Sequence, residues 1–159
     1  MTGITDLINV VYAEAERGLW QQNAARTNLD EVIALTRAGE LAIARSDGQL
    51  TGVVRIQQLD GDTGEFGMLA ADPAFRGRGI GRDLIRYAED STRSSGRRYM
   101  QLELLVPRTW TLASKEFLAA WYDRLGYRLQ RVGQIEEAYP DLAPLLSSPA
   151  DFRIYRKTL

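Results

Sequence analysis

The stretch Phe75 to Leu84, FRGRGIGRDL, constrains this chain most, because it joins three glycines and three arginines to the start of a helical pattern. From Ile80 onward, apolar residues recur with helical spacing at Ile80, Leu84, Tyr87 and Ala88. Glycine lets a ligand approach the main chain closely, and a helix N-terminus offers unpaired N–H donors and about half a positive charge. The sequence therefore predicts a phosphate site formed by Gly77, Gly79, Gly81 and the guanidinium groups of Arg76, Arg78 and Arg82.

The glycine-arginine stretch differs from two common nucleotide-binding loops. No Gly-Lys-Ser/Thr follows the glycines, which excludes a Walker A loop. Arg82 stands where the dinucleotide fingerprint would need its last glycine. The pattern Arg-x-x-Gly-x-Gly, at Arg76, Gly79 and Gly81, fits instead. The alternative is a tight strand-to-helix turn with solvated arginines.

Length and composition favour one soluble globular domain over residues 1–159. A chain of 159 residues buries roughly two-thirds of its unfolded surface, and 45% hydrophobic with 26% charged residues argues against disorder. A net charge of −1 argues against nucleic-acid binding as the main role. Because no N-terminal apolar run is long enough for a signal peptide or a membrane span, we expect a cytoplasmic protein without a membrane partner.

The absence of cysteine and histidine removes whole classes of mechanism. The chain has no cysteine nucleophile, no histidine base and no Cys/His zinc site, and we expect no metal. Acid-base chemistry must then use carboxylates, tyrosines, water, Lys115 or Lys157.

Four helices are expected from apolar spacing and capping residues. The first covers 4–17, with Leu7, Val10, Val11 and Ala15 on its apolar face. After a polar linker, 19–27, Asn28 and Glu31 resemble a capping box that opens a second helix, with Leu29, Val32, Ile33 and Thr36 on its face. The third runs from Ile80 to about Ser94, and Ser114 can cap a fourth whose apolar positions are Phe117, Leu118, Trp121, Tyr122 and Leu125.

Strand-like runs cover 41–45, 50–59, 65–70, 99–106, 127–135 and 152–157. The turn Ser46-Asp47-Gly48 predicts a hairpin between the first two runs, and the proline-containing segment 136–149 predicts a long loop with one helical turn. This order of helices and strands gives an α+β fold, or mixed-sheet sandwich, with helices on both faces.

Two separated motifs resemble the GNAT superfamily of acetyl-CoA-dependent N-acyltransferases. Arg76-x-x-Gly79-x-Gly81 follows GEFGMLAADPAF, which is similar to that family's fourth strand and its exit turn. Trp121-Tyr122-x-x-x-Gly126-Tyr127 matches a second signature of the family, so the resemblance covers nearly the whole chain. It implies a mostly antiparallel sheet of six to seven strands, acetyl-CoA as co-substrate, and a primary amine in a small molecule or peptide as acceptor. The resemblance does not decide whether the protein is a monomer or a homodimer.

The resemblance also implies a coenzyme site. Its residues are Met68, Leu69, Ala70, Ala71, Arg76, Gly77, Arg78, Gly79, Ile80, Gly81, Arg82 and Lys115. In the family, the main-chain N–H at the position of Leu69 binds the thioester carbonyl, and that of Ala71 binds the pantetheine. Many members have a pantetheine-binding asparagine at position 115, so Lys115 either contacts a CoA phosphate or is solvated.

Two catalytic candidates follow from the same resemblance, and a third follows from a polar position in an otherwise apolar strand. Tyr122 matches the tyrosine that protonates the departing thiolate, although it could be a core aromatic residue. Glu65 stands where some members place a general base, and Glu103 on the neighbouring strand is a second candidate. A carboxylate is a weak base unless it is partly buried, and a water relay is the alternative.

The amine acceptor is the least defined part of the expected site. In the family it enters between the loops that correspond to 18–28 and 136–151. Glu136, Glu137 and Asp141 could attract a cationic amine or simply be solvated, and Trp20, Trp110 and Tyr139 could line the entrance. The sequence does not distinguish among four kinds of acceptor: small amines, amino-acid derivatives, antibiotics and protein N-termini. A catalytically silent acyl-CoA-binding or regulatory module is the alternative function.

Overall fold

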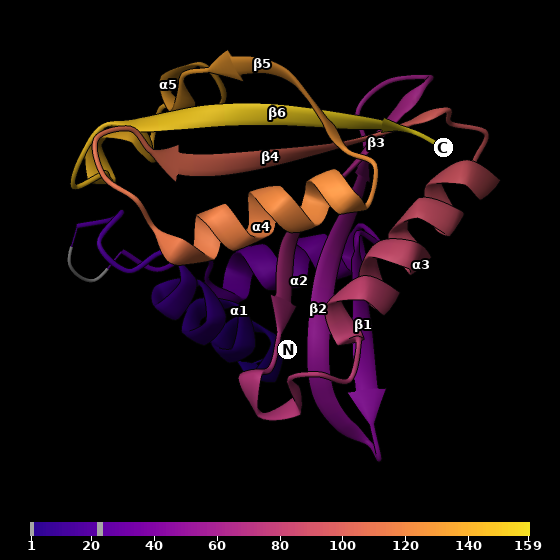
Figure 1. Cartoon of the computed structure of the whole chain (residues 1–159). Helices are drawn as coiled ribbons and strands as arrows, with labels where there is room; N and C mark the ends of the chain where they lie inside the picture. The colour runs from indigo at the N-terminus through magenta and orange to yellow at the C-terminus, as the bar shows by residue number, and fades with distance from the viewer. Residues whose placement is uncertain (1, 22–23) are drawn as a thin grey trace. The chain divides into compact units, whose positions relative to one another are not determined.

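The computed structural model describes residues 2–21 and 24–159, and it has the predicted α+β fold with a six-stranded sheet (Figure 1). The helices are α1 (Thr2–Ala15), α2 (Leu29–Arg37), α3 (Ile80–Ser94), α4 (Ala113–Arg124) and the short α5 (Ile135–Ala138). The strands are β1 (Leu41–Ser46), β2 (Gln49–Gln58), β3 (Thr63–Ala71), β4 (Tyr99–Pro107), β5 (Arg128–Gly133) and β6 (Ala150–Thr158). Their order in the sheet is β1-β2-β3-β4-β6-β5.

The chain divides into two compact units, which are described separately below. Unit 1 comprises Met1–Glu14, Ala25–Met100 and Thr158–Leu159, and unit 2 comprises Ala15–Ala24 and Gln101–Lys157. The reading of residues 1–159 as one domain stays a prediction. Gln22 and Asn23 of the expected polar linker lie outside the described residues.

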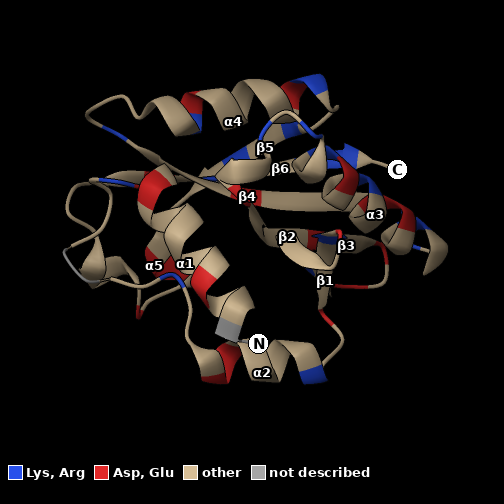
Figure 2. Cartoon of the chain, turned by 90° about the horizontal axis from the view of Figure 1, so that it is seen from below, with Lys and Arg blue, Asp and Glu red and all other residues tan. Residues whose placement is uncertain are grey.

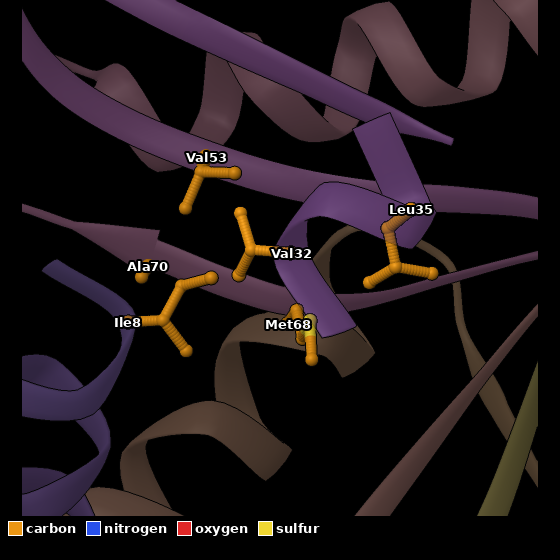
Figure 3. Close-up of a cluster of buried hydrophobic side chains, with 6 residues drawn as sticks. All are labelled: Ile8, Val32, Leu35, Val53, Met68 and Ala70. Atoms are coloured by element: carbon orange, nitrogen blue, oxygen red, sulfur yellow. The ribbon is translucent and has the colours of Figure 1, made fainter. Parts of the chain in front are cut away.

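Unit 1 is built on the antiparallel strands β1, β2 and β3. The predicted hairpin is confirmed, with Asp47 and Gly48 at positive φ between β1 and β2. One face of these strands packs against α1 and α2 through the cluster in Figure 3: Ile8, Val32, Leu35, Val53, Met68 and Ala70. The other face meets α3 so closely that a Cβ on Gly52 would lie 2.7 Å from the Ile80 side chain. Neighbouring strand residues point to opposite faces, so helices cover both sides of this sheet region.

The sequence patterns predict where the helices begin and end more accurately than they predict which residues of each helix are buried. The capping prediction for α2 is confirmed, because the Asn28 side chain accepts from the Glu31 N–H at 2.9 Å. The predicted apolar faces were partly wrong: Val10 is 63% exposed and Tyr87 is 58% exposed. Leu29 is also exposed, whereas the helices bury Ile8, Leu35, Leu84 and Ile85. Contact with the sheet decides which of several adjacent apolar positions is buried, and spacing alone does not.

Unit 2 contains a second core, formed by Leu19, Leu105, Ile135, Ala150, Phe152 and Ile154. Strands β5 and β6 are antiparallel, and the predicted loop before β6 contains the 3-10 turn Ala143–Leu145 after α5. The expected cap of α4 was wrong: Leu112 is the N-cap, and the Ser114 hydroxyl instead donates to the Ala15 carbonyl. Phe117 is exposed rather than part of a core face. Across residues 2–21 and 24–159, no helix is long and apolar enough to cross a membrane.

Candidate active site

The chain leaves β3 through a compact turn that ends at α3. The Asp72 carboxylate accepts from the Ala74 N–H at 2.9 Å, and a 3-10 turn follows at Pro73–Phe75. Gly77 and Gly79 then adopt φ values of +83° and +74°, a region that favours glycine. The predicted start of α3 at Ile80 is confirmed.

The N-terminus of α3 has donors that no side chain caps. Gly79 is the N-cap, and its carbonyl accepts the first helical bond, from the Asp83 N–H at 2.9 Å. The N–H groups of the first turn have no carbonyl partner within the helix. A Cβ on Gly79 would lie 2.5 Å from Arg82 Nη2, whereas one on Gly77 would meet open space. The turn thus presents bare backbone beside a guanidinium group.

The arginines of this turn are exposed. Arg78 lies over the Phe75 ring, with 5.0 Å from Cζ to the ring centroid. Arg82 Nε is 3.4 Å from Asp83 Oδ1, and both side chains are more than half exposed. Such exposed pairs contribute little, so Arg82 can exchange this partner for another anion. Along α3, acidic and basic residues are interspersed (Figure 2).

Strand β3 carries a bulge at the predicted carbonyl-binding position. Val53 pairs with Ala70 and Arg55 pairs with Gly67, so Met68 and Leu69 together face one residue of β2. Met68 has a φ of +50°, which is uncommon for a residue with a side chain. A bulge interrupts the ladder and redirects main-chain groups. The residue type at this position does not indicate a positive φ, because Met68 is neither glycine nor asparagine.

Glu65 lies on the same strand and is 5% exposed. Its Oε1 accepts from Gln57 Nε2 at 2.8 Å, across the β2–β3 pair. Glu65, the bulge and the glycine turn all belong to unit 1, on β3 or after its end.

Tyr122 and Lys115 are the two buried residues of α4, in unit 2. Tyr122 is 6% exposed; its ring stacks on Trp121 at 5.5 Å and meets Tyr127 edge-on at 6.2 Å. The Lys115 ammonium forms an ion pair with Glu16 Oε2 at 2.5 Å. Lys115 is therefore not solvated, which corrects one of the two readings of this position.

Glu103, on β4 in unit 2, is half-buried, and its Oε2 accepts from the Tyr139 hydroxyl at 2.9 Å. The Tyr139 ring meets Phe152 edge-on at 5.8 Å. This bond ties a strand residue to the loop before β6. Both residues are predicted site residues, but their contact could not be predicted, because 36 residues separate them.

The two loops expected to flank the acceptor are hydrogen-bonded to each other within unit 2. Trp20 and Leu146 form an isolated antiparallel bridge. The Gln21 N–H donates to the Leu145 carbonyl at 2.7 Å, and the Ser147 N–H donates to the Leu19 carbonyl at 2.8 Å. Within the described part of the chain, no group of acidic side chains could hold a metal ion.

Comparison with known proteins identifies the family. The model of the acetyltransferase (GNAT) domain matches residues 37–129, more than half of the chain. No curated protein matches the sequence.

Solved structures share the fold at low identity. An aminoglycoside 6'-N-acetyltransferase complexed with coenzyme A has a TM-score of 0.73 at 17% identity, over 99% of this chain and 89% of that chain. An acetyltransferase from Streptococcus agalactiae has a TM-score of 0.69 at 18% identity, over 99% and 90%. A GNAT acetyltransferase from Elizabethkingia anophelis with acetyl-CoA bound has a TM-score of 0.62 at 17% identity, over 83% and 84%. On the family match and this shared fold, the chain belongs to the GNAT acetyltransferase family.

Proposed function

We propose that this protein transfers an acetyl group from acetyl-CoA to a primary amine by direct attack in a ternary complex. The uncapped N-terminus of α3, with bare glycine backbone before it, carries this proposal. Two of the solved structures named above were determined with coenzyme A or acetyl-CoA, which supports the choice of ligand.

The residues of unit 1 fit such a coenzyme. The N–H groups from Gly77 to Arg82 hold the pyrophosphate, and the guanidinium groups of Arg76, Arg78 and Arg82 balance its charge. Along β3 the Leu69 N–H, beside the bulge, receives the thioester carbonyl, and the Ala71 N–H receives the pantetheine arm. Met68, Ala70, Ile80 and Gly81 complete this site. Lys115 is left out of it, because a buried carboxylate already balances its charge.

The proposal also assigns a general base and a general acid. The coenzyme supplies the acetyl group as a thioester. Glu65 takes the proton from the attacking ammonium, directly or through water, and the Tyr122 hydroxyl gives a proton to the leaving sulfur. Glu103 is the second candidate for the base. In unit 2 it contacts Tyr139, whereas in unit 1 Glu65 contacts Gln57.

The two candidate bases are separated by a matched pair of variants, Glu65→Gln and Glu103→Gln. If Glu65 is the base, its variant loses about 10²- to 10⁴-fold in rate near neutral pH and less at high pH, because the amine is then already deprotonated. We expect Glu103→Gln to retain its rate within a few-fold at every pH. Rate profiles against pH for both proteins decide the assignment. A pH-independent loss in Glu65→Gln, or a pH-dependent loss only in Glu103→Gln, contradicts it.

The acceptor is best described as a cationic primary amine in a small molecule or peptide. Exposed carboxylates at Glu136, Glu137 and Asp141 stand on the segment before β6, and they attract positive charge. One of the solved structures is named as an aminoglycoside 6'-N-acetyltransferase, which supports a small-molecule amine as acceptor. The alternative function, a silent acyl-CoA-binding module, keeps the glycine turn but has no turnover.

The proposal is tested by initial rates. A panel containing an aminoglycoside, a polyamine, an amino-acid amide and a short peptide with a free N-terminus is screened with acetyl-CoA for release of free thiol. For the best amine, rates measured across both substrate concentrations should give intersecting double-reciprocal lines. Parallel lines indicate a covalent acetyl-enzyme and contradict direct attack.

A further inference from the structure

The helix that carries Tyr122 is fixed at its other end by a buried ion pair. Lys115 and Tyr122 lie about two helical turns apart and are both buried. Residues at this spacing share one face of a helix, so one side of α4 holds both side chains. The Lys115 ammonium contacts the carboxylate of Glu16, which directly follows α1.

The contacts of Glu16 continue beyond the ion pair. Its Oε2 is 2.5 Å from Lys115 Nζ, and its Oε1 accepts from Trp20 Nε1 at 2.9 Å. The two charged side chains are only 5% and 7% exposed. Ser114, next to Lys115, donates its hydroxyl to the Ala15 carbonyl. The first turn of α4 thus holds the segment 15–21 through two side chains.

The same segment is bonded to the loop before β6. Trp20 bridges Leu146, and two main-chain bonds join 19–21 to 145–147 on either side of it. A third bond, from Gln21 Nε2 to the Pro144 carbonyl at 3.0 Å, extends this contact. A continuous chain of contacts therefore runs from Lys115 through Glu16 and Trp20 to Leu146.

We infer that Lys115 is a positioning residue. It holds the two loop segments expected to flank the acceptor, 15–21 and 145–147, on the helix that carries Tyr122. It fixes 15–21 directly and 145–147 through the bridge, and it has no part in binding coenzyme A. The effect on the acceptor rests on the proposed function, whereas the anchoring of the loops does not. The reason is electrostatic: without the Lys115 cation the Glu16 carboxylate is a buried, uncompensated charge, which favours separation of its segment from α4 and exposure of the carboxylate to water.

Hydrogen exchange on the free full-length protein tests the anchor. In Lys115→Met, the amides of Gln21 and Ser147, which donate in the contact between the loops, should exchange at least about tenfold faster. The amides of β1, β2 and β3 should keep their rates. The matched control is Arg128→Met, which removes an exposed ion pair with Asp123 next to the C-terminal end of α4 and should change neither set. If Lys115→Met does not fold, Glu16→Gln gives the same test, because its amide oxygen still accepts from Trp20.

Kinetics and binding test the consequence. With the best amine of the panel, Lys115→Met should raise the KM for the amine about tenfold and leave kcat and the Kd for coenzyme A within about twofold. Lys115→Arg keeps the charge and should restore most of the amine affinity. A residue with a purely structural role would change the KM for the amine, kcat and the Kd for coenzyme A together.

Three results overturn the inference. The first is a weaker affinity for coenzyme A with unchanged exchange at Gln21 and Ser147, which places Lys115 in the coenzyme site. The second is faster exchange throughout both units, which makes Lys115 a general stabilising residue. The third is faster exchange of the loops with an unchanged KM for the amine. If the wild type acetylates no amine, the proposed function fails, and the exchange experiment still decides the anchor.

Discussion

Replacing Tyr122 by Phe should lower the rate of acetyl transfer by about 10²- to 10⁴-fold, the usual contribution of a general acid. The change deletes one hydroxyl and keeps the ring, which stacks on Trp121 and meets Tyr127 edge-on. The affinity for coenzyme A and the melting temperature should therefore stay close to those of the wild type. Steady-state rates and titration with coenzyme A measure the two effects separately.

A second buried tyrosine on the same packing contact provides the control. Tyr127→Phe also removes a hydroxyl from a buried ring in contact with Tyr122, and it should keep nearly full rate. An acetyl thioester of a more acidic thiol should narrow the gap between wild type and Tyr122→Phe, because a better leaving group needs the proton less. A full rate in Tyr122→Phe, or an equal loss in both variants, makes Tyr122 a core residue.

Gly79→Val should abolish the stabilisation that coenzyme A gives to the folded protein. At a concentration of 100 times Kd, a ligand stabilises the folded state by about 2.7 kcal/mol, or about 5–10 °C in melting temperature for a chain of this size. Valine at φ +74° is strained, and its Cβ would lie 2.5 Å from Arg82 Nη2. The side chain displaces the guanidinium group and covers the backbone donors. Thermal melts with and without coenzyme A measure the loss.

The control for Gly79→Val introduces the same backbone strain at Gly39, in a turn that is far from Gly79 in the sequence. Gly39 has a φ of +72°, and a Cβ there would meet nothing within 4 Å. Gly39→Val should lower the melting temperature of the free protein yet keep the full shift with coenzyme A. If Gly79→Val keeps the shift as well, the glycine turn does not hold the pyrophosphate.

Features encoded by neighbouring residues could be predicted from the sequence. The Asn28 cap, the Asp47-Gly48 turn and the glycine turn before Ile80 depend on the conformations of a few adjacent residues, and the structure has all three. The α+β class follows from the order of such elements.

Features that depend on residues distant in the sequence could not be predicted from it. Met68 has its positive φ at a bulge in the pairing of β3 with β2, and Lys115 has its partner in a segment 99 residues away. Nothing in the sequence identified Glu16 as the partner of Lys115. Likewise, Val10 and Tyr87 fit helical patterns, yet the sheet does not cover them.

The central claim, acetyl transfer to an amine, is tested most directly by measuring two products in one reaction. The full-length protein is incubated with acetyl-CoA and each amine of the panel, and free thiol and acetylated amine are quantified together. We expect equal amounts of the two products for at least one amine, with thiol release that depends on that amine. Tight binding of coenzyme A, with thiol release no faster than without amine for every member of the panel, would contradict the claim and support a silent acyl-CoA-binding module.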